Sequence, residues 1–401
     1  MPSLPEELVE IIAKQLDTID IRSLRATSRL LAAKASRGHF RTAFHRKTIA
    51  LNAESLDKVI HLLKHDDLSR FLYNLTVPCG KQHDGAEHTL ACLLDSLTVT
   101  CTSREEHYED SDFPLLAKFF TLLQSGLDAR PLQALSARLT PECGTEIGES
   151  GWKVQCLTAG HVAKGIFLAI RDGGLKVECL DMFADQEYCS IPISIIGGCV
   201  DTDRAKLTSP DDVSDTFRDL QTVKRLAVSL THHPDLTLVE DTRIKGQMCA
   251  LVSLFKSMTH LVSLTLHWYK SLDRTAGRWD SAIEEIWLHC SLFTLTLPSL
   301  RHLELIGIPF QPDSLLDFLW RTSITHFAHQ GVCLGARRRL SRFMTAHTWR
   351  PILEHIASSE STITYFQLDD IVEKDCLYWF KWWMANLDLP NGRKWDPVKY
   401  A

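Results

Sequence analysis

One apolar spacing recurs along the chain and constrains its fold more than any other feature: an apolar residue, two residues, an apolar residue, one residue, an apolar residue. Two copies have leucine at all three positions, Leu261, Leu264, Leu266 and Leu300, Leu303, Leu305. Five weaker copies are Leu72, Leu75, Val77; Leu132, Leu135, Ala137; Val177, Leu180, Met182; Val223, Leu226, Val228; and Ile363, Phe366, Leu368. Each copy predicts a short strand.

Helical stretches lie between the predicted strands, at 114–123, 159–171, 211–220, 247–256, 313–321 and 347–357, and one more runs from Glu54 to Lys64. Pro312, Asp313 and Ser314 are typical of a helix start, which supports the helix at 313–321. Strands and helices that alternate at a period of roughly 35 to 65 residues favour parallel strands with helices on the outer side. We therefore expect a curved α/β solenoid.

The strand spacing resembles that of leucine-rich-repeat proteins, with one departure. Regular repeats have asparagine or cysteine three residues after the last strand leucine, where the side chain bonds the backbone of the turn. This chain has Tyr269, Ile308 and Ile371 at those positions. The solenoid should therefore be irregular, and a compact α/β domain is the alternative.

The first residues predict a short helical hairpin. Ser3 and Glu6 form a capping box that begins one helix, and Leu8, Ile12 and Leu16 recur at four-residue spacing along it. Asp20 is placed to cap a second helix. Two helices this short cannot cover their own apolar surface, so the remainder either packs on the rest of the chain or binds another protein.

This segment resembles the F-box pattern of leucine-proline, glutamate-leucine, isoleucine, leucine, aspartate-aliphatic, leucine and a small residue at fixed spacing. The matching residues are Leu4, Pro5, Glu7, Leu8, Ile12, Leu16, Asp20, Ile21, Leu24 and Ser28. The continuation is similar to a large group of fungal F-box proteins through Phe40, Arg41, Phe44, Ile49, Leu51, Ser55 and Leu56. Ile21 stands where the family commonly has leucine, a swap that nearly conserves volume. An unrelated helical hairpin is the alternative.

The resemblance implies an F-box over residues 1–50 and a leucine-rich-repeat-like substrate-recognition domain over residues 51–401. In that family the F-box binds a Skp-type adaptor, which links it to a cullin carrying the ubiquitin-transfer machinery. By position, the residues that would face the adaptor or shape the helix junction are Leu4, Pro5, Leu8, Ile12, Leu16, Ile21 and Leu24. The chain would then be the substrate-recognition subunit of an SCF-type ubiquitin ligase with an unknown target protein. A stand-alone α/β protein with a structural or enzymatic role is the alternative.

Charge and hydropathy disfavour two classes of partner. The formal net charge is -6, and the longest basic run is Arg337, Arg338 and Arg339, so we expect no nucleic-acid partner. The first seven residues lack a basic segment followed by an apolar one, which disfavours a secretory signal. The most apolar later stretch, Ile191 to Val200, is broken by Pro192 and is too short to span a membrane.

The cysteines and the polar clusters predict neither a cofactor nor catalysis. Twelve scattered cysteines without a Cys-x-x-Cys pair favour reduced thiols in the cytosol or nucleus. Cys79, His83, His88 and Cys92 are zinc-type ligands, but their spacing matches no common finger, so we expect no metal. No nucleophile motif or phosphate-binding glycine loop accompanies His232, His233, Asp235 and Glu240. We expect a protein that is not an enzyme.

Two further features are candidates for binding a target. Five segments are predicted as loop insertions: 79–87, 102–112, 140–151, 201–210 and 232–242. Acidic residues gather in or beside the second and the fourth, which are either solvated loops or sites for a basic partner. Nine of the ten tryptophans follow residue 260, and exposed aromatic residues often anchor protein interfaces, although most should pack in the core. The C-terminal half is therefore the first place to look for a target surface.

Overall fold

The computed structural model describes isolated positions between residues 8 and 27, and then residues 46–64, 96–102, 112–127, 130–140, 151–184, 186, 189–199, 217–231, 250–268, 292–308, 312–334, 350–373 and 376–382. The chain forms two compact units. Unit 1 comprises Met1–Cys101, Glu106–Thr140 and Leu168–Glu178, and unit 2 comprises Thr102–Glu105, Pro141–Phe167 and Cys179–Ala401.

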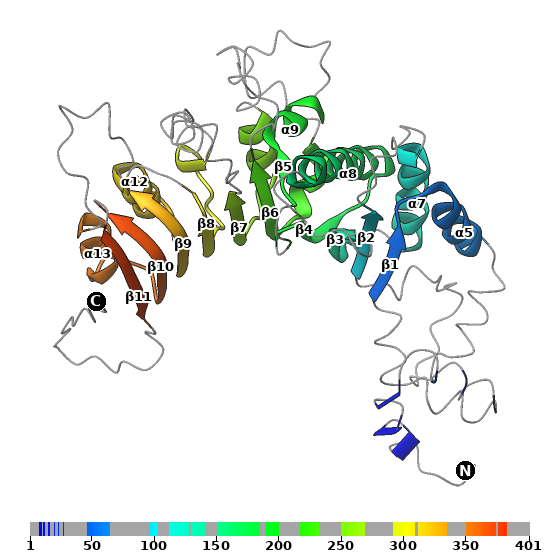
Figure 1. Cartoon of the computed structure of the whole chain (residues 1–401), viewed down its shortest axis with the longest axis horizontal. Coiled ribbons are helices and arrows are strands. Elements are labelled where there is room, and N and C mark those ends of the chain that lie inside the picture. The colour runs from blue at the N-terminus through cyan, green and yellow to red at the C-terminus, as the bar shows by residue number, and fades with distance from the viewer. Residues whose placement is uncertain are drawn as a thin grey trace. The chain divides into compact units, whose positions relative to one another are not determined.

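Unit 1 combines helices with a small parallel sheet (Figure 1). Its elements are β1 (Arg46–Ala50), α5 (Ala53–Lys64), β2 (Ser96–Thr102), α7 (Asp112–Gly126), β3 (Leu132–Thr140) and the last residues of α8 (Gly151–Gly173). β1 and β2 pair in parallel, and β3 follows β2 in the strand order. Leu56 of α5, Leu97 of β2 and Phe120 of α7 are fully buried and belong to the apolar core of this unit.

Unit 2 contains most of the strands. Its elements are β4 (Val177–Met182), β5 (Ile191–Pro192), α9 (Ile193–Cys199), β6 (Arg225–Thr231), β7 (Ser263–Trp268), β8 (His302–Ile306), α12 (Pro312–Arg321), β9 (His326–Leu334), α13 (Arg350–Ala357), β10 (Tyr365–Glu373) and β11 (Cys376–Trp382). The strand order is β4-β6-β7-β8-β9-β10-β11, and β5 pairs with β6. The pairs from β4 to β10 are parallel, whereas β11 runs antiparallel to β10.

The parallel register aligns the recurring apolar positions into buried rows. Leu226 pairs with Leu264, Leu264 with Leu303, and Leu303 with Phe327. A second row, two residues further along each strand, contains Val228, Leu266, Leu305, His329 and Leu368. Every member of both rows is almost fully buried. Because successive side chains of a strand point to opposite faces, the residues between these rows lie on the other face of the sheet.

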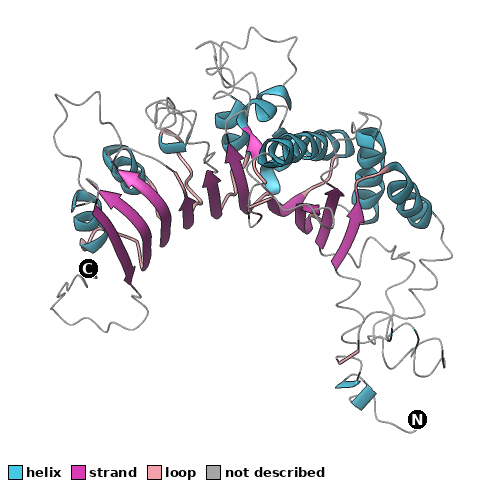
Figure 2. Ribbon diagram, in the orientation of Figure 1, coloured by secondary structure: helices cyan, strands magenta, loops and turns pink. Residues whose placement is uncertain are grey.

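Helices cover the buried face of the sheet in unit 2. α12 and α13 lie on the same side of β8, β9 and β10 (Figure 2). α12 buries Leu315, Phe318 and Leu319, while Asp313 and Asp317 on its opposite side are exposed. This amphipathic pattern places the apolar stripe of the helix against the strands.

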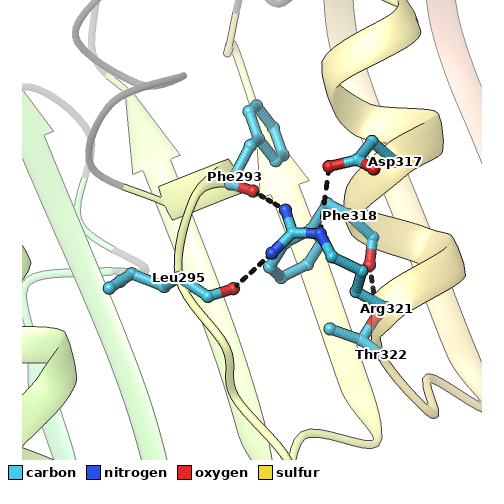
Figure 3. Close-up of polar contacts among 6 residues, drawn as sticks. All are labelled: Phe293, Leu295, Asp317, Phe318, Arg321 and Thr322. Carbon is cyan, nitrogen blue, oxygen red and sulfur yellow. Dashed lines mark hydrogen bonds and ion pairs between the residues drawn. The ribbon is translucent and has the colours of Figure 1, made fainter.

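One arginine of α12 holds the segment that precedes β8. The guanidinium of Arg321 donates to the backbone oxygens of Phe293 and Leu295, the latter at 3.4 Å, and to the Asp317 carboxylate at 2.9 Å (Figure 3). The Phe293 and Phe318 rings meet edge to face beside it, with centroids 5.6 Å apart. The side chain thus supplies donors to carbonyls that lie outside any sheet ladder.

A glycine ends β8. Gly307 has φ +68°, and a Cβ at this position would lie 2.6 Å from the backbone oxygen of Trp268. Its amide donates to the Gln330 oxygen at 2.7 Å. Only glycine accommodates both the left-handed backbone and this close approach of β7.

The mixed α/β class with parallel strands is confirmed. Strands occur at six of the seven predicted positions, and the seventh, at Leu72 to Val77, lies outside the described residues. α5, α7, α8, α12 and α13 confirm five of the predicted helices, and helical turns at 217–222 and 250–257 overlap the other two. The predicted loop insertions lie largely or wholly outside the described residues. The apolar spacing did not predict β1, β2, β5, β9 or β11.

A search of the described helices for a membrane-crossing segment found none of sufficient length and hydrophobicity.

Candidate interaction surfaces

The first surface is the apolar side of the N-terminal helix. Leu8, Ile11 and Ile12 are 45%, 56% and 42% exposed, whereas Val9 is 2% exposed. These positions are helical, and Leu16 just beyond them is half-buried. One buried position beside three exposed apolar ones shows that part of the apolar side faces solvent in the isolated chain.

Three of the seven residues predicted to contact an adaptor can be placed. Leu8 and Ile12 are exposed and Leu16 is half-buried. Leu4, Pro5, Ile21 and Leu24 lie outside the described residues. The last residues of the segment predicted as an F-box, Arg46–Ala50, form β1 of the sheet.

The second surface is the face of the unit 2 sheet opposite to α12 and α13, here called the open face. Its residues from β6 to β10 include Arg225, Ala227, Ser263, Thr265, His267, His302, Glu304, Ile306, His326, Ala328, Gln330, Tyr365 and Gln367. These residues are exposed or half-buried, in contrast to the buried rows between them, whereas Ser229 and Thr231 at the end of β6 continue the same face and are buried. The parallel register aligns Arg225, Ser263, His302, His326 and Tyr365 across five strands.

Three rings stack along that row. The His302 and His326 imidazoles are almost parallel, with centroids 4.3 Å apart and planes 6° apart. The His326 and Tyr365 rings follow at 5.4 Å and 22°. The Tyr365 hydroxyl donates to Gln367 Oε1, and Thr325 Oγ1 lies 3.1 Å from Nδ1 of His326. The stack is therefore held at two of its three members before any partner binds.

Charged groups on the open face also have fixed partners. Thr265 Oγ1 donates to Glu304 Oε2 at 3.0 Å, which ties β7 to β8. Arg225 Nε lies 2.9 Å from the Cys179 sulfur of β4. Arg301, next to His302, donates to the backbone oxygens of Pro298 and Leu300 at 3.1 and 2.9 Å. The positive charges of Arg225 and Arg301 thus lie at the amino ends of the strands. The Glu304 carboxylate lies one row further along.

Burial acts on the histidines of this face. It lowers the pKa of His302, and a charge on the neighbouring His326 lowers that pKa further. Burial also lowers the pKa of His267. Desolvation disfavours the charged imidazole, so the neutral form of both residues predominates at neutral pH.

A small polar cluster lies at the ends of β6 and β7. The Ser190 and Ser229 hydroxyls are 2.6 Å apart, and Ser229 Oγ lies 3.4 Å from Nδ1 of His267. Both serines are 0% exposed. Burial raises the pKa of the nearby Cys156 thiol to about 12 and that of Cys189 to about 11. No substrate reaches these hydroxyls, and thiols of such high pKa stay protonated, so the cluster stabilises the fold.

No described set of three or more His, Cys, Asp or Glu side chains is placed to hold a metal ion. The possible zinc ligands Cys79, His83, His88 and Cys92 lie outside the described residues. So do His232, His233, Asp235 and Glu240.

The burial of two tryptophans after residue 260 is described, and one lies in the core and one at the surface. Trp268 is 2% exposed, whereas Trp320 on α12 is 64% exposed and stacks on His355 of α13 at 5.4 Å. The sequence-based reasoning missed the His302, His326 and Tyr365 stack. These residues could have been found at one position of the pattern, directly before its second apolar residue. The pairing register brings the residues at this position together on neighbouring strands.

Comparison with known families identifies the N-terminal segment. Residues 1–40 match the F-box domain, so the chain carries an F-box at its N-terminus, as the residue pattern predicted. A comparison with curated proteins found no match.

Proposed function

We propose that the chain is a non-catalytic substrate-recognition subunit of an SCF-type ubiquitin ligase. Its F-box binds a Skp-type adaptor, and through it a cullin, while the remainder of the chain binds a target protein. F-box domains typically serve as the adaptor-binding element of such ligases, so the match over residues 1–40 carries the proposal. The assignment requires no cofactor, and it places the protein in the cytosol or nucleus, where ubiquitin ligases act.

The exposed apolar residues of the N-terminal helix support adaptor binding. Leu8 and Ile12 are two of the positions that the F-box pattern assigns to that contact, and both are nearly half exposed. Full burial of a leucine or isoleucine stabilises a complex by about 1.5 to 3 kcal/mol relative to full exposure. Residues that are already half-buried gain about half as much, so several must act together to offset the cost of association.

For the remainder of the chain we propose an irregular leucine-rich-repeat-like solenoid. The strand-helix units of unit 2 and the aligned rows of leucine support this architecture. Ile308, which stands where regular repeats have asparagine or cysteine, is 0% exposed and packs as an apolar residue. The open face, which no described helix covers, is the proposed target surface.

Co-purification of the full-length chain with a Skp-type adaptor tests the first contact. Leu8→Asp removes apolar contact and puts a charge into the interface, and we expect it to weaken binding by roughly 30-fold to 1000-fold, about 2 to 4 kcal/mol. Gln15→Asp is the matched control, because Gln15 is exposed on the same segment but outside the predicted contact. It should change binding less than about threefold.

Two outcomes would reject the ligase assignment. One is failure of the wild-type chain to bind the adaptor under conditions where a known F-box protein binds. The other is equal binding by the wild type and Leu8→Asp. Either result would favour the alternative of a stand-alone α/β protein.

A further inference from the structure

The amino-terminal row of the open face consists of Arg225, Ser263, His302, His326 and Tyr365. The residues directly before them in the sequence are Lys224, Val262, Arg301, Thr325 and Thr364. Arg225 carries a formal positive charge within the row, Lys224 and Arg301 carry two more beside it, and none of these ten residues carries a carboxylate. The chain as a whole has a net charge of -6, so this row is a local excess of positive charge.

The exposed members of the row can meet a ligand. Arg225, His302 and His326 are exposed, and the half-buried Ser263 lies between Arg225 and His302 in the register. Adjacent strands are about 4.8 Å apart, so the row from β6 to β9 spans about 14 Å. An extended peptide covers that distance in four or five residues, and it places alternate side chains on one side.

The donors of this row suit carboxylates. The Arg225 guanidinium supplies N–H donors, Ser263 supplies a hydroxyl, and each imidazole supplies a ring N–H. Stacking restricts the orientations of the His302, His326 and Tyr365 rings, so these side chains lose less conformational entropy when a ligand binds. Glu304, one row further along, repels a second row of negative charge and confines an anionic ligand to the amino-terminal row.

We propose that this row binds an acidic segment of the target protein, in extended conformation across β6 to β9, through Arg225, Ser263, His302 and His326. The inference rests on the proposed function for the identity of the partner as a ligase target. A short acidic segment fits better than a nucleic acid, because three formal cations on a chain of net charge -6 do not neutralise a long polyanion.

Fluorescence anisotropy with the full-length chain tests the proposal. The probe is a fluorescein-labelled peptide in which glutamate alternates with serine, and a glutamine-serine peptide is the uncharged comparison. We expect the glutamate peptide to bind at least about tenfold more tightly in 50 mM salt and to lose most of that advantage at 200 mM. Equal binding of the two peptides would overturn the proposal.

Variants locate the site. Arg225→Glu should weaken binding of the glutamate peptide at least tenfold. Arg218→Glu makes the same change of net charge at another exposed position of unit 2, outside the row, and should change binding less than about twofold. Equal effects of the two variants would show that net charge alone attracts the peptide, and would overturn the proposal.

A gain of binding excludes misfolding as the explanation. Glu304→Gln removes the carboxylate that lies one row from His302 on the open face and keeps a side-chain oxygen that can accept from Thr265. It should strengthen binding of the glutamate peptide about twofold to fivefold. Weaker or unchanged binding contradicts the proposal.

A single-stranded oligonucleotide of equal charge is the third probe. Tighter binding of this oligonucleotide, lost in Arg225→Glu, would replace the acidic segment with a nucleic acid. These measurements do not include the adaptor, so the two proposals can fail separately. If the chain binds the peptide but not the adaptor, the acidic-segment site stands and the ligase assignment is rejected. If the chain binds the adaptor but not the peptide, only the ligase assignment stands.

Discussion

His302 and His326 stack face to face across β8 and β9, with their ring centroids 4.3 Å apart, although they are 24 positions apart in the sequence. The pairing register places them directly opposite each other on the open face. When both rings are neutral, this arrangement gains stacking contact. When both are protonated, two positive charges face each other at close range, so the pair resists double protonation.

Removal of one imidazole should therefore raise the pKa of the other. In His326→Gln the pKa of His302 should rise toward its ordinary value, because the charge that lowers it is gone, while the lowering by burial remains. Glu304, on the same strand and two residues from His302, is kept in the variant. An NMR titration of selectively labelled histidine follows this pKa. Tyr365→Phe keeps both imidazoles and is the control; an unchanged His302 pKa in His326→Gln contradicts the prediction.

The buried His329 should make the fold sensitive to acid. It is 1% exposed between Leu305 and Leu368 in the register, and burial lowers its pKa well below the ordinary value. Below about pH 6.5 the His329 side chain binds a proton in the unfolded chain but stays neutral in the folded chain. The free energy of unfolding therefore falls as the pH falls. While this difference is one proton, the slope is about 1.4 kcal/mol per pH unit.

His329→Leu tests this link. Leucine fits between two leucines and cannot be protonated, so the loss of stability between pH 6.5 and pH 5 should become shallower in the variant. Urea unfolding at a series of pH values measures the slope. His260→Leu, the same substitution at an exposed position of the same unit, is the control. Parallel pH curves for His329→Leu and the wild type would show that His329 does not cause the sensitivity.

His329 also explains why β9 escaped prediction. Ile324, Phe327 and His329 have the strand spacing of the other copies, and all three are buried. The third position is a polar residue, which a search for apolar patterns rejects. A neutral imidazole nevertheless fits in the row of Leu305 and Leu368. In β2, Leu94, Leu97 and Val99 also have this spacing, and Leu97 and Val99 are buried, so the sequence contains a copy of the pattern that was not recognised.

Strand positions followed from local spacing because each apolar set must be buried on one face, whichever strand lies beside it. The composition of the open face did not follow, because the residues between the first two apolar positions vary from copy to copy. Which of these residues become neighbours on the open face depends on which strands pair and in what register. Pairing and register are properties of the whole sheet. The F-box was predictable because its residues lie within one short segment and match at fixed positions.

The Arg321 contacts should stabilise the segment before β8. In Arg321→Ala the backbone oxygens of Phe293 and Leu295 lose the donors that the guanidinium supplies, and we expect the free energy of unfolding to fall by about 1 to 2 kcal/mol. Asp317→Asn removes only the partly exposed ion pair within α12 and should cost about 0.5 kcal/mol or less. Urea unfolding followed by tryptophan fluorescence compares the two variants. Equal costs would show that the carbonyl contacts add nothing to the ion pair.

Gly307 and Gly174 have the same left-handed backbone but different surroundings. Their φ values are +68° and +62°; a Cβ at Gly307 would lie 2.6 Å from the Trp268 oxygen, whereas a Cβ at Gly174 would meet nothing within 4 Å. Gly174→Ala should therefore cost only the left-handed conformation, about 1 to 2 kcal/mol. Gly307→Ala should cost more, about 2 to 4 kcal/mol, because β7 and β8 must also separate.

Amide hydrogen exchange distinguishes these two costs, because it reports on each strand separately. In Gly307→Ala, exchange should accelerate in β8 and at the Gly307 amide, which donates to Gln330 of β9. In Gly174→Ala, any acceleration should be confined to residues near the end of α8 and the start of β4. If β8 keeps its wild-type protection in Gly307→Ala, the contact with Trp268 is relieved by a small shift, and glycine is needed there for its backbone conformation alone.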